Sequence, residues 1–229
     1  MSPSSSSSSV QFFIHATDRM SSTAPNSFHW SLVVGRLVAD DEDYKFHATN
    51  ALIPGPTGAA ELTQWGTAPW RYESRAIQPI DKQLLLCRVH LGAIQGLSAS
   101  ESTNLREAIL IVDQILRDVA LPTFDDAGVQ QGNCSTWLAS ALLALHESGR
   151  LAWDPTSVDP VEFKAAVQAH AYARKKELAQ RLGRPSTRLR LQVRTMIATT
   201  VGKLGLRSGD SQQSQEDVGL EQILAELRS

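Results

Sequence analysis

One cysteine of this sequence lies where a thiol is suited to act as a nucleophile. Cys134 follows Gly132 and Asn133, and an apolar segment with helical spacing runs from it to Gly149. The unpaired backbone N–H groups and the dipole at the start of a helix favour negative charge, so this position lowers the pKa of a thiol. The same N–H groups can donate to the oxyanion of a tetrahedral intermediate. The sequence therefore predicts Cys134 as the nucleophile of an acyl-transfer reaction.

Two of the six histidines suit the role of its base. His29 opens the strand-like run Phe28–Val34 directly after a turn-prone segment, and a strand would hold its imidazole rigidly. His47 lies in the next strand-like run, Tyr44–Thr49. Neighbouring strands would place His47 behind His29, where it fixes the tautomer and orientation of the imidazole that accepts the thiol proton. The predicted catalytic set is therefore His29, His47 and Cys134, in that chain order.

The same residues also have structural interpretations. Cys134 can be a small packed residue at a helix start, and without His29 that role would be equally expected. A backbone carbonyl or Asn50 can orient His29 in place of His47. Tryptophans are more typical of a core than of a binding site. Four residues close in sequence to the catalytic candidates are nevertheless expected to contact the substrate: Trp30, Asn133, Trp137 and Asp126.

The elements that must position these residues fall into a strand-rich part followed by a helical part. Runs of β-branched and aromatic residues predict strands over Val10–His15, Trp30–Val34, Tyr44–Thr49, Trp70–Ile77 and Leu84–Ile94. Apolar residues spaced three and four apart then predict helices that begin after Ser102 and after Asn133. Because the strands come first and the helices afterwards, the class is α+β, an antiparallel sheet packed against helices.

Composition limits the choice of compartment and cofactor. The net charge of −2 and the pI near 6.3 give the whole chain no bulk attraction for nucleic acid or anionic membrane. Its two cysteines, Cys87 and Cys134, belong to no C-x-x-C pair, so we expect neither a disulfide framework nor a structural zinc site. We expect no metal and no other cofactor. No segment has the features of a signal peptide or the ~20 apolar residues of a membrane span, so we expect a cytoplasmic protein.

The sequence divides into four segments. Residues 1–9 are a serine-rich tail expected to be disordered, 10–160 form the predicted catalytic domain, 161–207 form a basic helical extension, and 208–229 are a polar tail with one short helix. Residues 161–210 contain 11 Lys or Arg and 3 Asp or Glu. Such a concentration can follow a phosphate backbone, although a charge run is usually only a solvated helix surface. The candidate phosphate-binding residues are Arg174, Lys175, Lys176, Arg181 and Arg184.

The motifs resemble those of the permuted papain-like proteins, the NlpC and lecithin retinol acyltransferase group. The resemblance covers roughly residues 10–150 and rests on His29-Trp30 at the start of a strand, His47 in a second strand, and Asn133-Cys134-x-x-Trp137 on a helix. Small fungal proteins with similar signatures form the branch that the chain resembles most. The resemblance implies a permuted papain-like fold with Cys134 as nucleophile, His29 as general base and His47 as orienting group. The long insertion before Cys134 and the basic C-terminal helices are not part of the family pattern.

Three functions are compatible with these features. The first is a thiol-dependent acyltransferase or hydrolase with an acyl-thioester on Cys134, whose acyl donor is a small molecule or a carrier. Members of the resembled group include acyltransferases, phospholipases, amidases and peptidases, so the resemblance implies a reaction type and no substrate. The second is a transferase that accepts an aminoacyl group from tRNA in the manner of a cyclodipeptide synthase, with the basic helices holding the tRNA. The third is a non-catalytic binding protein on the same scaffold.

Overall fold

The central feature of the protein is a six-stranded sheet. The structure is a computed structural model that describes residues 9–19, 27–37, 42–52, 62–64, 67–98, 104–181 and 218–227. The strand order is β4-β3-β2-β1-β5-β8, and all neighbours are antiparallel except β5 and β8, which are parallel. The strands are β1 Gln11–Asp18, β2 Phe28–Gly35, β3 Tyr44–Thr49, β4 Arg71–Ala76, β5 Leu85–Ala93 and β8 Val218–Gly219.

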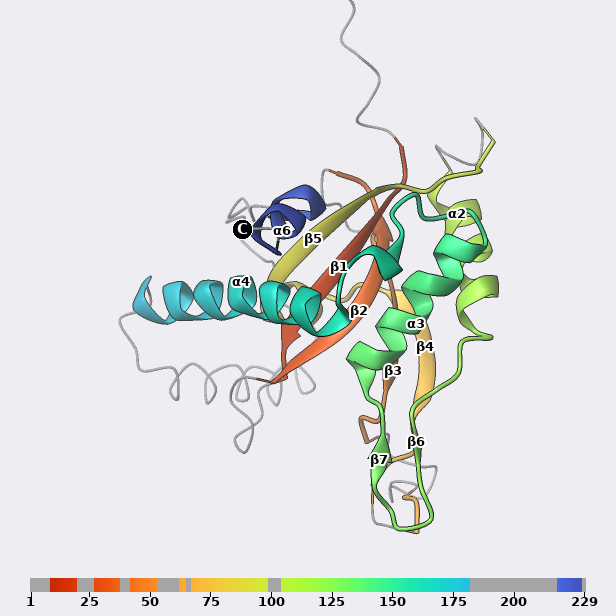
Figure 1. The fold of residues 1–229 in the computed structure, drawn as a ribbon, viewed down its shortest axis with the longest axis vertical. Coiled ribbons are helices and arrows are strands. Elements are labelled where there is room, and N and C mark those ends of the chain that lie inside the picture. The colour runs from red at the N-terminus through yellow and green to blue at the C-terminus, as the bar shows by residue number, and fades with distance from the viewer. Residues whose placement is uncertain are drawn as a thin grey trace, which may run out of the picture.

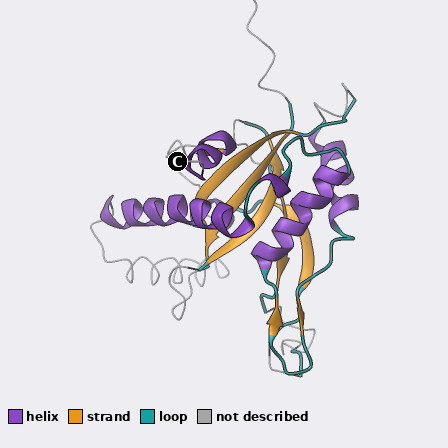
Figure 2. Cartoon of the chain, in the orientation of Figure 1, coloured by secondary structure: helices purple, strands orange, loops and turns teal. Residues whose placement is uncertain are grey.

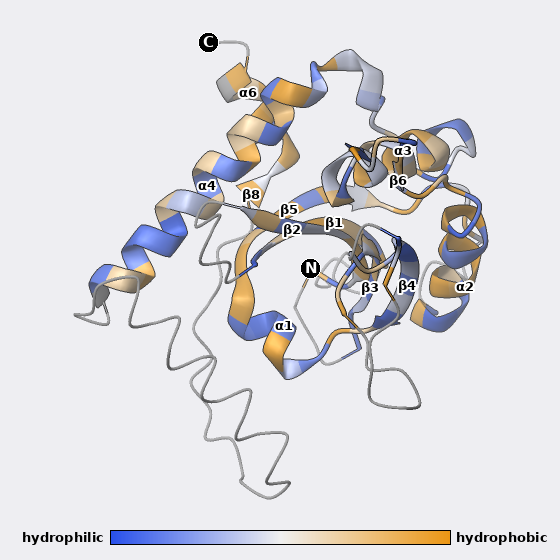
Figure 3. Ribbon diagram, turned by 90° about the horizontal axis from the view of Figure 1, so that it is seen from below, coloured by the Kyte–Doolittle hydropathy of each residue, from blue (hydrophilic) through white to orange (hydrophobic). Residues whose placement is uncertain are grey.

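Helices cover the sheet unequally. The first, α1 Pro79–Leu84, lies on one side of the sheet, and the remaining helices lie on the other (Figures 1 and 3). Figure 2 shows that a small two-stranded hairpin projects beyond this body, next to the start of α3. The helices of the second side are α2 Leu105–Leu116, α3 Cys134–Glu147, α4 Pro160–Arg181 and α6 Leu220–Leu227. The hairpin consists of β6 Thr123–Phe124 and β7 Gln130–Gln131. A 3₁₀ turn, η1, spans Pro155–Ser157.

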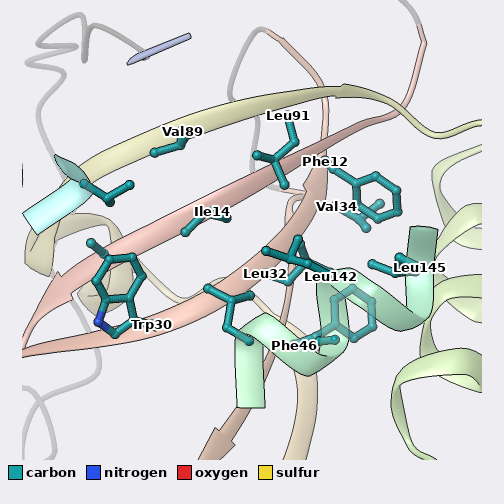
Figure 4. Close-up of a cluster of buried hydrophobic side chains, with 14 of the residues drawn as sticks. Phe12, Ile14, Trp30, Leu32, Val34, Phe46, Val89, Leu91, Leu142 and Leu145 are labelled. Atoms are coloured by element: carbon teal, nitrogen blue, oxygen red, sulfur yellow. The ribbon is translucent and has the colours of Figure 1, made fainter. Parts of the chain in front are cut away.

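The main core lies between the sheet and the helices of this second side. Alternate residues of a strand point to opposite faces, so Trp30, Leu32 and Val34 of β2 point together toward the helices. They pack with Phe46 of β3 and with the apolar stripe of α3, which includes Leu142 (Figure 4). The helical spacing of that stripe and the alternation in β2 together place the start of α3 against the sheet. The prediction of an α+β fold with a sheet packed on helices is confirmed.

The basic segment begins inside this core. Phe163, Val167 and Ala171 of α4 are buried in the same cluster as β2 and α3, so α4 belongs to the main body and is not an appended extension. Near the other end of the chain, α6 contributes Ile223 and Leu224, which are 0% and 5% exposed. The short helix predicted in the polar C-terminal tail is confirmed, and its apolar residues, which recur at helical spacing, pack against α4 and β5.

Several local features differ from the sequence-based expectation. The run between the fourth and fifth predicted strands contains α1, which begins at Pro79, a residue favoured in the first turn of a helix. The segment around Asp125 forms the β6–β7 hairpin, in which the backbone N–H of Ala127 donates to the Asp125 side chain. Apart from Ser9, the expected serine-rich tail lies outside the described residues, as do residues 182–207 of the basic segment. Within the described residues, no helix has the length and apolar composition needed to cross a bilayer.

Candidate active site at the β2–β3 gap

The start of α3 is fixed by a reciprocal cap. The side chain of Asn133 accepts hydrogen bonds from the backbone N–H groups of Ser135 (2.8 Å) and Thr136 (3.4 Å). The Thr136 hydroxyl in turn accepts from the backbone N–H of Asn133 at 2.7 Å. Gly132 precedes this cap with a φ of +85°, a conformation that glycine adopts without strain. The sequence Gly132-Asn133 thus ends the preceding loop and places Cys134 in the first turn of α3.

This cap changes two expectations. Asn133 was expected to contact substrate, but its side chain is occupied as the N-cap of α3. The backbone N–H groups at the start of the helix were expected to hold an oxyanion, but two of them, those of Ser135 and Thr136, already donate to Asn133. The cause is the identity of the residue before Cys134, because asparagine is among the strongest N-caps. The oxyanion donors must therefore come from other backbone groups.

The Cys134 thiol is buried against β2. The residue is 3% exposed, and its sulfur lies 4.0 Å from the Phe28 carbonyl oxygen. Burial raises the pKa of the thiol, although the backbone N–H of Trp30 donates to the sulfur and lowers the pKa in part. The expected activation by the helix start is therefore outweighed by desolvation. In the resting protein Cys134 is a protonated thiol.

The sulfur occupies a gap in the sheet between β2 and β3. The ladder joins Leu32 with Phe46 and ends there, so residues 28–31 have no backbone partner on β3. The His29 carbonyl accepts from the Thr17 hydroxyl of β1, so the polar groups of Phe28 and Trp30, one residue to either side, point the other way, toward β3. The thiol therefore takes the place that the backbone of β3 would occupy in a continuous ladder.

Both predicted histidines meet in the same gap. His29 Nε2 lies 2.5 Å from His47 Nδ1, and the two ring planes are inclined at 76°. Burial, followed by the charges of Lys45 and Arg19, lowers the pKa of His29 to about 3. Burial, His29 and Lys45 lower the pKa of His47 to about 2. Both imidazoles are therefore uncharged at neutral pH, and their lowered pKa values make them weak proton acceptors in the resting protein.

A carboxylate that the sequence analysis did not identify stands behind His47. Glu73 of β4 is paired in register with His47, and its Oε2 lies 3.2 Å from His47 Nε2. Arg71 binds the other carboxylate oxygen through Nη2 at 2.6 Å and Nε at 2.7 Å. The alternation of charged and uncharged residues in Arg71–Arg75 is the signal that could have placed Glu73 on the face of His47 once β3 and β4 were paired.

The thiol and the imidazoles approach this gap from different sides. Cys134 belongs to the core cluster of the helix side together with Phe28 and Trp30. His29 lies between those two residues in β2, so its ring points to the opposite face. Within the described residues, the sulfur has hydrogen-bond contacts with backbone groups and with neither imidazole. The structure thus brings His29 and His47 together and places Cys134 beside the backbone of His29, without a direct contact between sulfur and imidazole.

The imidazoles belong to a wider polar face that α1 covers. Lys45 Nζ lies 2.7 Å from Asp81 Oδ1, and Arg75 Nη1 lies 2.7 Å from Asp81 Oδ2. His15 of β1 is paired in register with Ser31 of β2 on this face. Within the described chain, His15 Nε2 and Ser31 Oγ are buried and make no hydrogen bond. The face that α1 covers therefore holds a dense set of polar groups beside the small apolar cluster of Phe13, Val33 and Ile77.

The other predicted substrate residues lie elsewhere. Trp30 and Trp137 are 3% and 1% exposed and belong to the core, so neither lines a surface that a substrate reaches. Their size and their positions on the inner faces of β2 and α3 explain this burial. Asp126 lies in the exposed turn between β6 and β7. The two tryptophans therefore have structural roles, whereas the substrate contact of the exposed Asp126 stays a prediction.

The predicted basic surface is partly neutralised by internal ion pairs. Arg174 lies 2.7 Å from Glu177, and Lys175 lies 2.9 Å from Asp18 at the end of β1. Lys176 is exposed. Arg181 is the last residue of α4 and its side chain is outside the described atoms, as is the whole of Arg184. Within the described residues, no cluster of His, Cys, Asp and Glu has the arrangement of a metal site.

Comparison with known proteins identifies the family. A family model matches residues 12–196, a range that runs from the second residue of β1 past the end of α4 and includes all of the gap residues. The chain belongs to DUF6914, a family of unknown function. No curated protein and no solved structure matches the chain. The DUF6914 match contains Cys134, His29, His47 and Glu73, and it ends before β8 and α6.

Proposed function

We propose that this DUF6914 protein is a cysteine-dependent acyl-transfer enzyme with a permuted papain-like arrangement, working through an acyl-thioester on Cys134. The observation that carries the proposal is the convergence of three elements on the β2–β3 gap. The start of α3 brings the thiol to within 4.0 Å of the Phe28 carbonyl, and β2 and β3 bring the two imidazoles to within 2.5 Å of each other. A thiol beside an oriented pair of neutral imidazoles is the equipment of nucleophilic catalysis.

The resting charges determine how the reaction begins. A protonated thiol and neutral histidines exclude a preformed thiolate–imidazolium pair, so proton transfer accompanies attack. Attack requires a rearrangement in the gap that brings the sulfur and the His29 imidazole, which lie on opposite faces, into contact. His29 then takes the thiol proton as the sulfur bonds to the carbonyl carbon of an ester, thioester or amide. The backbone N–H groups of Trp30 and Cys134, which already point at the sulfur, stabilise the oxyanion beside it.

The second half returns the enzyme to its starting state. The tetrahedral intermediate collapses, the leaving group departs with the proton held by His29, and the acyl-thioester remains on Cys134. Water, an alcohol or an amine then gives its proton to His29 and attacks the thioester carbon. The thiolate leaves and recovers the proton from His29. Reduced thiols of this kind suit the cytoplasm, which is the location that we propose.

Acetylation by p-nitrophenyl acetate tests the proposal, and Cys87 provides a matched control. Cys87 is 4% exposed and Cys134 is 3% exposed, so burial alone gives the two thiols the same protection. We expect intact-protein mass spectrometry and peptide mapping to find the acetyl group on Cys134 and not on Cys87. Cys134→Ala should abolish the adduct, Cys87→Ala should retain it, and His29→Gln should slow its formation. Equal labelling of both cysteines, or unchanged labelling in Cys134→Ala, would contradict the proposal.

A further inference from the structure

The two oxygens of the Glu73 carboxylate have different partners. One oxygen accepts from Arg71 Nε at 2.7 Å and Nη2 at 2.6 Å, while the remaining guanidinium nitrogen donates to the Ala51 carbonyl at 2.7 Å. A guanidinium has only donors, so the group that faces Arg71 must be an acceptor. The second carboxylate oxygen is left to face His47. Arg71 therefore fixes which oxygen of the Glu73 carboxylate faces His47.

His47 Nε2 has few ways to be satisfied. This nitrogen is buried and makes no hydrogen bond of good geometry within the described residues. The Glu73 oxygen lies 3.2 Å away, but the N–H direction of the ring nitrogen does not point at it. Buried polar groups in folded proteins almost always find a partner. Glu73 is 28% exposed, so its side chain has room to make the small rotation that aligns this contact. The alignment makes a hydrogen bond in which the carboxylate can only accept.

The direction of that bond propagates to His29. If Nε2 of His47 carries the proton, Nδ1 of the same neutral ring is an acceptor. The 2.5 Å contact is then made by the Nε2–H of His29 donating to His47 Nδ1. This leaves the lone pair of His29 on Nδ1. Without the carboxylate, the reverse arrangement would satisfy the His29–His47 contact equally well and would put the proton on His29 Nδ1.

We infer that Glu73, held by Arg71, sets the tautomers of His47 and His29, so that Nδ1 of His29 is the nitrogen that receives a proton. Glu73 acts through His47 and is a positioning residue. The role of this nitrogen in accepting the Cys134 proton rests on the proposed function, but the tautomers themselves do not. The assignment adds a fourth member, on β4, to a site built from α3, β2 and β3.

Glu73→Gln tests the inference because of Arg71. The guanidinium retains the glutamine oxygen, so the amide NH₂ faces His47 and must donate to Nε2. His47 Nδ1 then carries the proton and donates to His29 Nε2, and both tautomers are reversed. Imidazole ¹⁵N NMR of the resting protein distinguishes protonated from unprotonated ring nitrogens directly. In both rings, we expect the nitrogen that is protonated in the wild type to become unprotonated, and the other nitrogen to become protonated. Acetylation of Cys134 should slow by at least about tenfold, since a base in the wrong tautomer is severely impaired.

A double variant separates this mechanism from a general loss of structure. In Arg71→Met/Glu73→Gln the glutamine can present either its oxygen or its NH₂ to His47, so neither set of tautomers is imposed and both should be populated. Arg71→Met alone keeps the carboxylate and should keep the original tautomers. Unchanged tautomers in Glu73→Gln, reversed tautomers in Arg71→Met, or a double variant as completely reversed as Glu73→Gln would overturn the inference. If the tautomers reverse as expected but wild-type Cys134 is never acetylated, the proposed function fails and the role of Glu73 stands.

Discussion

Replacing one buried histidine should make the free energy of unfolding depend less steeply on pH in the acid range. His15 is 5% exposed, and burial, followed by the charges of Arg88 and Lys45, lowers its pKa to about 3. The folded-state pKa lies below that of the unfolded chain, about 6.5. The free energy of unfolding is therefore unaffected by this histidine above pH ~6.5 and decreases as the pH falls toward about 3, because only the unfolded chain binds the proton in this window. Gln in place of His15 cannot take up this proton.

The size of the effect follows from these two pKa values. Linkage gives a loss of about 2 kcal/mol per such histidine between about pH 6 and about pH 4.5, a window largely above the titration of ordinary carboxylates. His29 and His47 have pKa values shifted in the same direction. Together the three groups approach the whole stability of a typical domain, about 5–15 kcal/mol. His15→Gln should therefore remove about a third of this acid destabilisation.

Urea unfolding followed by tryptophan fluorescence at several pH values measures the difference. The control is Ser31→Ala, which removes the neighbouring polar group that does not titrate. This control should shift the free energy of unfolding by the same amount at every pH. His15→Gln should instead gain stability relative to wild type as the pH falls. An unchanged pH dependence in His15→Gln would refute the assignment of a buried, neutral His15.

Two further predictions concern the start of α3. Asn133→Ala removes the side chain that accepts from two backbone N–H groups and should cost about 1 kcal/mol, measured as a lower melting temperature with the fold retained in circular dichroism. Gly132→Ala should destabilise more than Gly149→Ala in urea unfolding. Both glycines have positive φ, +85° and +69°, but an added Cβ at Gly132 would lie 2.6 Å from the Thr136 hydroxyl, whereas at Gly149 it meets nothing within 4 Å. Equal losses would show that this clash is relieved without cost.

Local sequence signals predicted the elements that carry the site. Residues 44–49 were predicted as a strand with the bounds that the structure shows, and Asn133 before an apolar helical segment predicted the start of α3. The proximity of His29 and His47 was also predicted, because consecutive strands usually pair. These features depend on residues near one another in the sequence, which is why pattern and spacing were sufficient.

The remaining parts of the site depend on pairing between distant segments. The oxygen of Glu73 faces His47 only because β3 and β4 pair in one particular register. The burial of Cys134 depends on how α3 packs on β2, and the thiol sits where the ladder between β2 and β3 ends. No local pattern marks the point where two strands separate. The missed α1 has six residues, too few for an amphipathic period to stand out.

The position of α6 has a consequence for anyone who shortens this chain. The family match ends at residue 196, but Ile223 and Leu224 are packed against α4 and β5 from beyond that limit. A protein trimmed to the end of the family match would leave the apolar residues of α4 and β5 that face α6 uncovered, and uncovered apolar patches promote aggregation. Recombinant versions should therefore keep the chain through residue 227, and poor solubility of a trimmed version would reflect this missing cover rather than a defect of the β2–β3 gap.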